Sequence, residues 1–147
     1  MPEAHLHDYR SSQVDPQDFD AFWDESIAAA RAAASDVLIE PVDSGLATLD
    51  VFDVTFSGWD GQPVRAWLHV PKGATGPLPA VVQYIGYGGG RGHHLENLLW
   101  ASSGFVSFQM DTRGQGSGWS RGDTPDPVGS GPQYPGVMTR GIDSKEN

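Results

Sequence analysis

Two apolar segments in the middle of the chain, separated by a glycine-dense turn and a short helical pattern, constrain the fold most strongly. Residues 80–85 (AVVQYI) show no clean alternation of apolar and polar side chains, which is typical of a strand covered on both faces of a parallel sheet. Leucines from Leu95 onward predict a short helix that stops at Gly104. Residues 105–110 (FVSFQM) then predict a second buried strand. A strand–helix–strand order predicts a βαβ unit and an α/β fold.

The N-terminal part of the chain predicts a loose segment and then a helix. Residues 1–14 are polar and unpatterned, and we expect them to form a flexible arm. Asp15 and Pro16 predict a helix start, with Asp15 as the N-cap and Pro16 at the first helical position. Apolar side chains then recur every three or four residues as far as Ala30, so one face of this helix is expected to be buried. Residues 15–147 are expected to form one domain.

Three strand-like segments follow the helix, at residues 37–42, 49–57 and 64–70. The third alternates apolar side chains with Arg65, Trp67 and His69, and His69 is expected to serve packing or to lie on the surface. The Asp60-Gly61 pair is a strong signal for a hairpin turn between the last two segments. The predicted order is therefore a helix, an antiparallel hairpin and then the βαβ unit.

Composition excludes several classes of function. The 147 residues include 9 Lys and Arg against 19 Asp and Glu, for a formal net charge of −10, so no surface for nucleic acid is expected. No apolar run approaches the ~20 residues that cross a bilayer, and no export signal is evident, so we expect a cytoplasmic protein without membrane contact. The chain has no cysteine, which removes disulfides, thiolate metal sites and cysteine nucleophiles. No cofactor is expected.

The glycine-dense turn, residues 86–92 (GYGGGRG), is the main candidate for chemistry. Arg91 occupies the third glycine position of a dinucleotide fingerprint, and no lysine completes a phosphate-binding loop. Two interpretations stay open. Glycine leaves backbone N–H groups uncovered, so a turn at the carboxyl end of a parallel strand can stabilise negative charge as part of an oxyanion hole. Glycine-rich turns also serve purely structural roles.

Other candidates carry weaker signals. Gly118 to Gly122 (GWSRG) matches the nucleophile-elbow pattern, but the proline-rich residues that follow cannot open the required helix, so Ser120 is not expected to be a nucleophile. His93, His94 and Glu96 lack a metal-ligand spacing, so no metal site is expected. Arg113 follows the second buried strand, beside the glycine turn, and is expected to tie these loops together through backbone carbonyls without taking part in chemistry.

Several motifs, taken in order, resemble the acetyl xylan esterase/cephalosporin C deacetylase family of carbohydrate esterases. The resemblance spans roughly residues 14–142. The matching motifs are residues 18–20 (DFD), 22–23 (FW), 53–56 (DVTF), 84–92 (YIGYGGGRG), 110–119 (MDTRGQGSGW), 122–126 (GDTPD), 135–136 (PG) and 138–142 (MTRGI). Their length and order make the likeness far more specific than one short pattern.

The resemblance implies the N-terminal part of an α/β-hydrolase with an incomplete sheet. It implies a serine esterase that removes acetyl groups from xylo-oligosaccharides and cephalosporin C, in a homo-oligomer. Tyr87 matches the family tyrosine whose backbone N–H forms half of the oxyanion hole, with Gly86 and Gly88 in the supporting loop. Arg113, Gly114 and Gln115 match the family's R-G-Q signature.

The family's nucleophile, acid and histidine come later than any residue of this chain, so no catalytic residue is expected within it. We therefore hypothesise a truncated form, produced by an early stop, a frameshift or a fragment boundary. Its inner strand, residues 80–85, would then form an open sheet edge, which favours aggregation or pairing with another chain. Two functions follow: an esterase half-site that is inactive alone, or a non-catalytic remnant that complements a partner chain.

Overall fold

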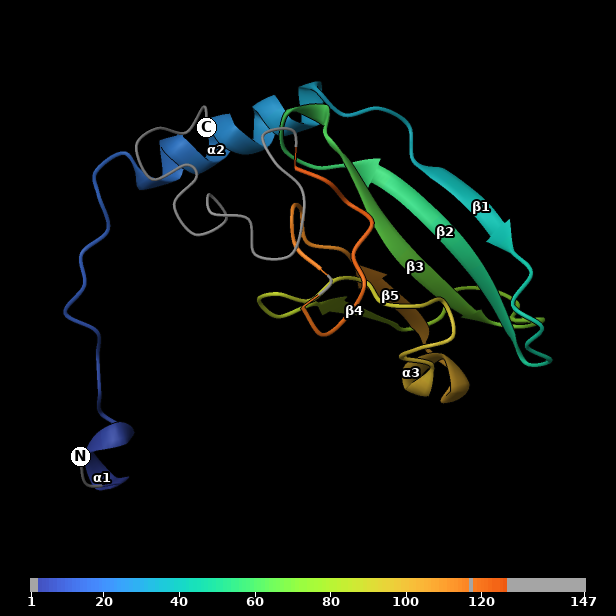
Figure 1. Cartoon of the computed structure of the whole chain (residues 1–147). Coiled ribbons are helices and arrows are strands. Elements are labelled where there is room, and N and C mark those ends of the chain that lie inside the picture. Colours follow the sequence, from blue (N-terminus) through green and yellow to red (C-terminus); the bar gives the residue numbers. More distant parts are fainter. Residues whose placement is uncertain (1–2, 117, 127–147) are drawn as a thin grey trace.

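The computed structural model describes residues 3–116 and 118–126, which include one five-stranded sheet and several helices, of which the N-terminal one is set apart from the sheet (Figure 1). In chain order the elements are α1 (Glu3–Leu6), α2 (Phe19–Ala32), β1 (Leu38–Val42), β2 (Leu49–Ser57), η1 (Trp59–Gly61), β3 (Pro63–Pro71), β4 (Ala80–Tyr84), α3 (Leu99–Ser102) and β5 (Val106–Met110). The strand order is β1-β2-β3-β5-β4. Neighbouring strands are antiparallel except β4 and β5, which are parallel. The α/β class, the hairpin and the βαβ unit are thereby confirmed.

The hairpin of β2 and β3 is the longest paired unit of the sheet. Its register runs without interruption from Leu49 opposite Pro71 to Ser57 opposite Pro63. Asp60 and Gly61 both adopt positive φ, at 54° and 70°, as a tight turn between strands requires. The Asp-Gly signal thus predicted the turn correctly.

The register sorts the strand side chains onto two faces. The first, here called the polar face, carries Val51, Asp53, Arg65, Trp67, His69, Gln83, Ser107 and Gln109. The second, here called the apolar face, carries Phe52, Val54, Phe56, Val64, Ala66, Leu68, Val82, Tyr84, Phe108 and Met110. Successive residues of a strand point to opposite faces, so this division follows directly from the pairing.

The polar face is covered by the segment between β4 and α3. The Trp67 indole N–H donates to Gly92 O at 2.9 Å, and His69 Nε2 lies 2.9 Å from His94 O. His69, Ser107 and Gln109 are buried beneath this segment, so in β5 the most buried side chains are polar ones. His69 accordingly serves packing, one of the two roles expected of it.

The apolar face is buried at the hairpin and open at β4. Val54, Val64 and Ala66 lie in the core, whereas Val82 and Tyr84 of β4 are 49% and 78% exposed. The prediction of a strand covered on both faces is therefore wrong for β4, because no described segment packs on its apolar face. β4 also pairs only with β5 among the strands described, and this open edge agrees with the expected incomplete sheet.

Both helix predictions need correction at their boundaries, and the apolar face of α2, which was expected to be buried, is exposed in the described structure, with Trp23 at 50% and Ile27 at 44%. α2 begins at Phe19, after a turn in which the Phe19 N–H donates to Pro16 O at 3.1 Å, so Asp18 and not Asp15 is the N-cap. α3 is only four residues long, because Asn97 adopts a φ of 56° that interrupts the helix predicted from Leu95. A short helix, α1, lies within the segment expected to be a flexible arm. None of the helices in the described ranges combines the length and apolar character that a membrane crossing needs.

Candidate functional site

The glycine-dense segment begins with a tight turn at the carboxyl end of β4. The Gly89 N–H donates to Gly86 O at 3.0 Å, and Gly88 adopts a φ of 78°. A positive φ at the third residue alone is the pattern of a type II turn, and it favours glycine there. Tyr87 occupies the second position of this turn and is 53% exposed.

The backbone N–H of Tyr87 has no hydrogen-bond acceptor within the described part of the chain, although its neighbours are held firmly. The Gly88 N–H donates to Gln115 Oε1 at 2.7 Å. The Trp119 indole N–H donates to Tyr87 O at 3.1 Å. The Tyr87 amide is therefore a donor that none of the described residues uses, on a turn whose tyrosine is half exposed.

The loop that follows β5 packs directly against the glycine segment, as the strand order predicts. The Gly118 N–H donates to Gly88 O at 3.2 Å, and the Gly92 N–H donates to Arg121 O at 2.8 Å. A Cβ atom on Gly90 would collide with the backbone of Arg121 and Gly122. The approach of the two backbones, and not the turn itself, thus requires glycine at position 90.

Ser120 takes part in this packing and lacks the setting of a nucleophile. Its hydroxyl donates to Gly90 O at 2.7 Å. No helix follows it within residues 121–126, so the strand–turn–helix geometry of a nucleophile elbow is missing there. This agrees with the expectation that the GWSRG pattern is accidental.

Asp111, the first residue after β5, joins the two loops through its carboxylate. It is completely buried, and its Oδ1 accepts the Arg91 N–H at 3.0 Å and the Thr112 N–H at 3.1 Å. Its Oδ2 accepts the Asp123 N–H. One carboxylate therefore holds backbone from both the glycine segment and the loop after β5.

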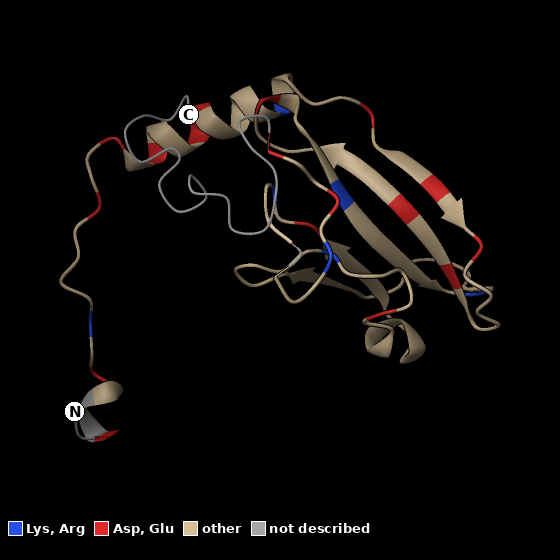
Figure 2. Cartoon of the chain, in the orientation of Figure 1, with Lys and Arg blue, Asp and Glu red and all other residues tan. Residues whose placement is uncertain are grey.

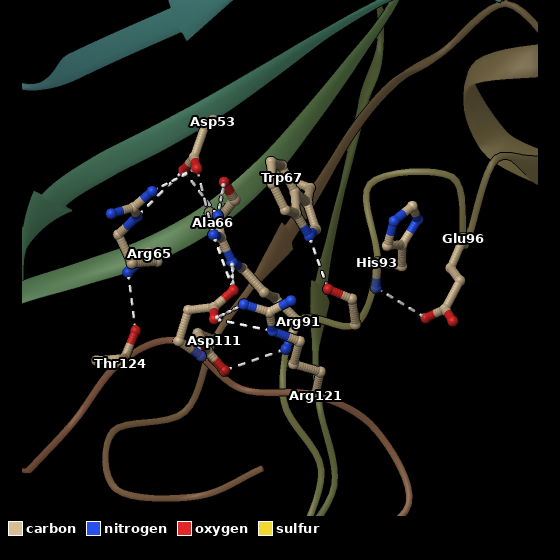
Figure 3. Close-up of polar contacts among 12 residues, drawn as sticks. Asp53, Arg65, Ala66, Trp67, Arg91, His93, Glu96, Asp111, Arg121 and Thr124 are labelled. Atoms are coloured by element: carbon tan, nitrogen blue, oxygen red, sulfur yellow. Dashed lines mark hydrogen bonds and ion pairs between the residues drawn. The ribbon is translucent and has the colours of Figure 1, made fainter. Parts of the chain in front are cut away.

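Arg91 is the charged centre beneath these loops, and Figure 3 shows its contacts. Its side chain is only 3% exposed and forms ion pairs with Asp53 at 2.7 Å and with Asp123 at 3.0 Å. It also donates to Ala66 O at 3.0 Å and lies over the Trp67 ring, 3.8 Å from its centroid. A buried guanidinium with this many partners fixes the glycine segment to the sheet. Sequence reasoning treated Arg91 only as the residue that breaks a dinucleotide motif.

The ion pairs around Arg91 shift the ionisation of Asp53. Burial alone would raise the pKa of the Asp53 carboxyl, but hydrogen bonds and charge from Arg91 and Arg65 outweigh burial and hold the pKa below its ordinary value. The hydrogen bond between Arg65 and Asp53 in turn raises the pKa of the Arg65 guanidinium. Both partners therefore stay charged at neutral pH.

The R-G-Q motif lies in this loop, but its members do different things. Gln115 contacts the glycine segment, as described above, and the Gly114 N–H donates to Thr124 O at 2.9 Å with a φ of 72° at Gly114. Arg113 donates to Gln62 Oε1 at 2.8 Å and pairs with Asp126 at 3.0 Å. It thus binds side-chain acceptors next to the hairpin turn, and not the backbone carbonyls that were expected.

The histidines form no metal site in the part of the chain that is described, where no three potential ligands gather. The rings of His93 and His94 stack at 4.1 Å, and the Glu96 carboxylate accepts the His93 N–H at 3.1 Å. Burial lowers the pKa of His69, and the nearby His94 adds to this, although the bond to His94 O opposes it. The His69 Nδ1 is buried and has no partner among the residues that the structure describes, which suits the neutral ring.

The comparisons with known proteins agree with this geometry. The sequence profile of the acetyl xylan esterase (AXE1) family matches residues 1–147. The chain belongs to the acetyl xylan esterase family. It corresponds to an N-terminal portion of that family, as the motifs from residue 18 to residue 126 predict; those at residues 135–142 lie outside the described residues.

Two solved structures of acetyl xylan esterases resemble this chain. The enzyme from Paenibacillus sp. R4 is 38% identical with a TM-score of 0.80, and the match covers 99% of this chain and 46% of that one. Acetyl xylan esterase 1 from Thermoanaerobacterium sp. JW/SL YS485 is 28% identical with a TM-score of 0.68, over 82% of this chain and 38% of that one. The chain therefore spans less than half the length of these relatives.

Proposed function

We propose that this chain supplies the oxyanion side of an ester-hydrolysing site that removes acetyl groups from acetylated xylo-oligosaccharides and from cephalosporin C. The two similar solved structures are acetyl xylan esterases, which supports this reaction class. The attacking serine, with its histidine and acid, would come from a segment outside this chain. The working enzyme would be a cytoplasmic homo-oligomer that needs no cofactor.

The chemistry requires a donor at the place where charge develops. When a nucleophile attacks the ester carbonyl carbon, the carbonyl electron pair moves onto oxygen and a tetrahedral oxyanion forms. A fixed backbone N–H aimed at that oxygen stabilises it, and one such donor contributes roughly 10²–10³-fold to the rate. We assign this donor to the Tyr87 N–H.

One observation carries the proposal: among the described residues no acceptor takes the Tyr87 N–H, while its flanking groups are fixed. Gln115 and Trp119 both hold the peptide group between Tyr87 and Gly88. The peptide group that carries the Tyr87 N–H is held through Gly86 O, which accepts the Gly89 N–H at 3.0 Å. The N–H at the second position of a turn takes no part in the turn's own hydrogen bond, so at the carboxyl end of a parallel strand it is available to a substrate oxygen.

The decisive experiment uses a chimera in which this chain replaces the matching part of the Paenibacillus sp. R4 enzyme. Proline suits the second position of a type II turn and has no N–H, so Tyr87→Pro removes the donor while keeping the turn. We expect kcat for p-nitrophenyl acetate to fall by about 10²-fold or more with little change in KM.

Tyr87→Phe is the matched control, because it retains the N–H and loses only the hydroxyl. We expect it to keep kcat within about threefold of the parent chimera, since no transition-state donor is lost. Equal kcat values for the proline and phenylalanine variants, with melting temperatures unchanged, would refute the assignment of Tyr87.

A second function, a non-catalytic half that complements a partner chain, is favoured by the unpaired edge of β4. Its test adds a separately produced C-terminal portion of the Paenibacillus sp. R4 enzyme to the pure chain. We expect no hydrolysis of p-nitrophenyl acetate by the chain alone and recovery after mixing. Activity of the chain alone that Ser120→Ala abolishes would instead restore Ser120 as a nucleophile.

A further inference from the structure

A cavity of about 530 Å³ opens beside the polar face, and its lining does not include the turn that holds Tyr87. Segments from three parts of the chain form its wall: strands β2 and β3, the end of the glycine segment, and the loop after β5. The lining residues are Asp53, Arg65, Trp67, Arg91, Gly92, His93, His94, Arg121 and Asp123. Its volume falls within the range of about 300–1,000 Å³ that holds small ligands.

The charge of this cavity is opposite to that of the molecule. Three of the chain's nine basic residues line it, together with two aspartates and two imidazoles, for a net charge of +1 with the imidazoles neutral. The chain as a whole carries −10, and acidic residues occur along α2, β1 and β2 (Figure 2). An anion is therefore attracted to this cavity and repelled by most of the remaining surface.

Two of the three guanidiniums keep donor capacity for a ligand. Arg65 uses Nε and Nη2 on Asp53, and Arg121 uses Nε and Nη2 on Asp123. The Nη1 group of each has no acceptor among the described residues. His93 Nδ1 accepts the Leu95 N–H at 3.3 Å, so its Nε2 carries the proton and is a further donor.

We propose that this cavity binds the carboxylate of a sugar-sized acid, such as a uronic acid. The planar guanidinium groups of Arg65 and Arg121 match the geometry of a carboxylate, and the imidazole of His93 adds a third donor. The carboxylates of Asp53 and Asp123 disfavour a dianion such as phosphate, because two like charges already lie in the wall. The cavity is far larger than one carboxylate and has room for the attached ring.

The test is a titration of the ¹⁵N-labelled full chain with sodium D-glucuronate at constant ionic strength, followed by NMR. The reporters are the Trp67 indole N–H, which donates to Gly92 O, and the Gly92 backbone N–H, which donates to Arg121 O; both residues line the cavity. We expect saturable shifts of both signals with glucuronate, and none with D-glucose, which has the same ring without the carboxylate. Inorganic phosphate is expected to bind at least about threefold more weakly than glucuronate.

Arg121→Gln is the informative variant, because Arg121 is mostly exposed and its loss leaves Arg91 with all its partners. We expect it to weaken glucuronate binding at least about fivefold. Arg31→Gln, on α2 and outside the cavity, makes the same change in net charge and is expected to leave binding within about twofold.

Three outcomes overturn the proposal: equal shifts with glucose, equal weakening in the two arginine variants, or phosphate binding more tightly than glucuronate. Binding is measured here without hydrolysis. If the Tyr87 experiment refutes the esterase proposal, the glucuronate result still stands. If glucuronate does not bind, the proposed role of Tyr87 is unaffected.

Discussion

The two faces of the sheet are used in opposite ways. The polar face carries charged and hydrogen-bonding side chains, yet it is covered by the glycine segment and holds the candidate site. The apolar face carries mostly hydrophobic side chains, yet at β4 it is exposed over Val82 and Tyr84. Whether a strand residue is buried therefore depends on which connecting segment covers it and not on the hydrophobicity of its strand. Substitutions on the two faces are accordingly expected to have different effects on stability.

The largest effect is expected at Arg91 on the polar face. Arg91→Ala leaves the carboxylates of Asp53 and Asp123 without their shared partner in a buried setting, so we expect a loss of about 3–5 kcal/mol in the free energy of unfolding. Urea denaturation followed by circular dichroism measures it. Arg31→Ala is the exposed control, with an expected loss below about 0.5 kcal/mol; equal losses would show that the buried ion pairs contribute little.

The next effect concerns the packing of the two loops over the polar face. Gly90→Ala inserts a methyl group against the backbone of Arg121 and Gly122, which cannot rotate away, and should cost about 3 kcal/mol. Gly86→Ala is the control, because its nearest neighbour would be the Trp119 ring at 4.0 Å and its φ is not positive. We expect the melting temperature of the Gly90→Ala variant to lie clearly below that of Gly86→Ala. Equal melting temperatures would show that the two loops do not pack closely at Gly90.

A matched pair of valines compares the apolar face at its buried and open ends. Val54→Ala removes a buried side chain of β2 and should cost about 2 kcal/mol, and Val82→Ala on β4 should cost less than about 0.5 kcal/mol. The same urea titrations give both values. A cost at Val82 as large as that at Val54 would mean that β4 is covered in solution, for example by self-association, which sedimentation would detect.

The smallest effect is a pH dependence from His69. Burial lowers its pKa from the ordinary value of 6.5, so below about pH 6.5 the unfolded chain binds a proton that the folded chain does not. The contribution of His69 to stability is therefore complete above pH 6.5 and decreases as the pH falls below it. His69→Gln keeps a donor for His94 O without titrating, so its unfolding free energy should change less between pH 7.5 and 5.5 than that of the parent.

His7→Gln controls for that measurement, since His7 is exposed in the N-terminal segment. It should show the same pH dependence as the parent chain. A His69→Gln variant with the parent's full pH dependence would assign the effect to another group, with His94 the first candidate because burial and His93 lower its pKa too.

Short sequence patterns predicted correctly those parts of the fold that depend on neighbouring residues, such as turns and strand order. The Asp60-Gly61 turn fixed the hairpin, and the spacing of strand, glycine turn and strand predicted the parallel pair of β4 and β5. The start of α2 was misplaced because Pro16 opens a turn before the helix and does not itself begin it. The exposure of β4 was misjudged because an apolar run does not say whether another segment covers it.

The candidate site was predictable only in part, for the same reason. The glycine segment and Gln115 could be placed from their order after strands β4 and β5. Arg91 could not be assigned a role, because its partners Asp53 and Asp123 lie 38 and 32 positions away in the chain. In the sequence, Arg91 is only a single arginine within a run of glycines, and that pattern does not indicate which residues it contacts.

The carboxylate of Asp111 has a practical consequence for protein engineering. Because it anchors an amide in each of the two loops, neither loop keeps its shape when transplanted alone. A designer who moves the Tyr87 turn into another scaffold has to carry the second loop and its aspartate along, as one inseparable cassette.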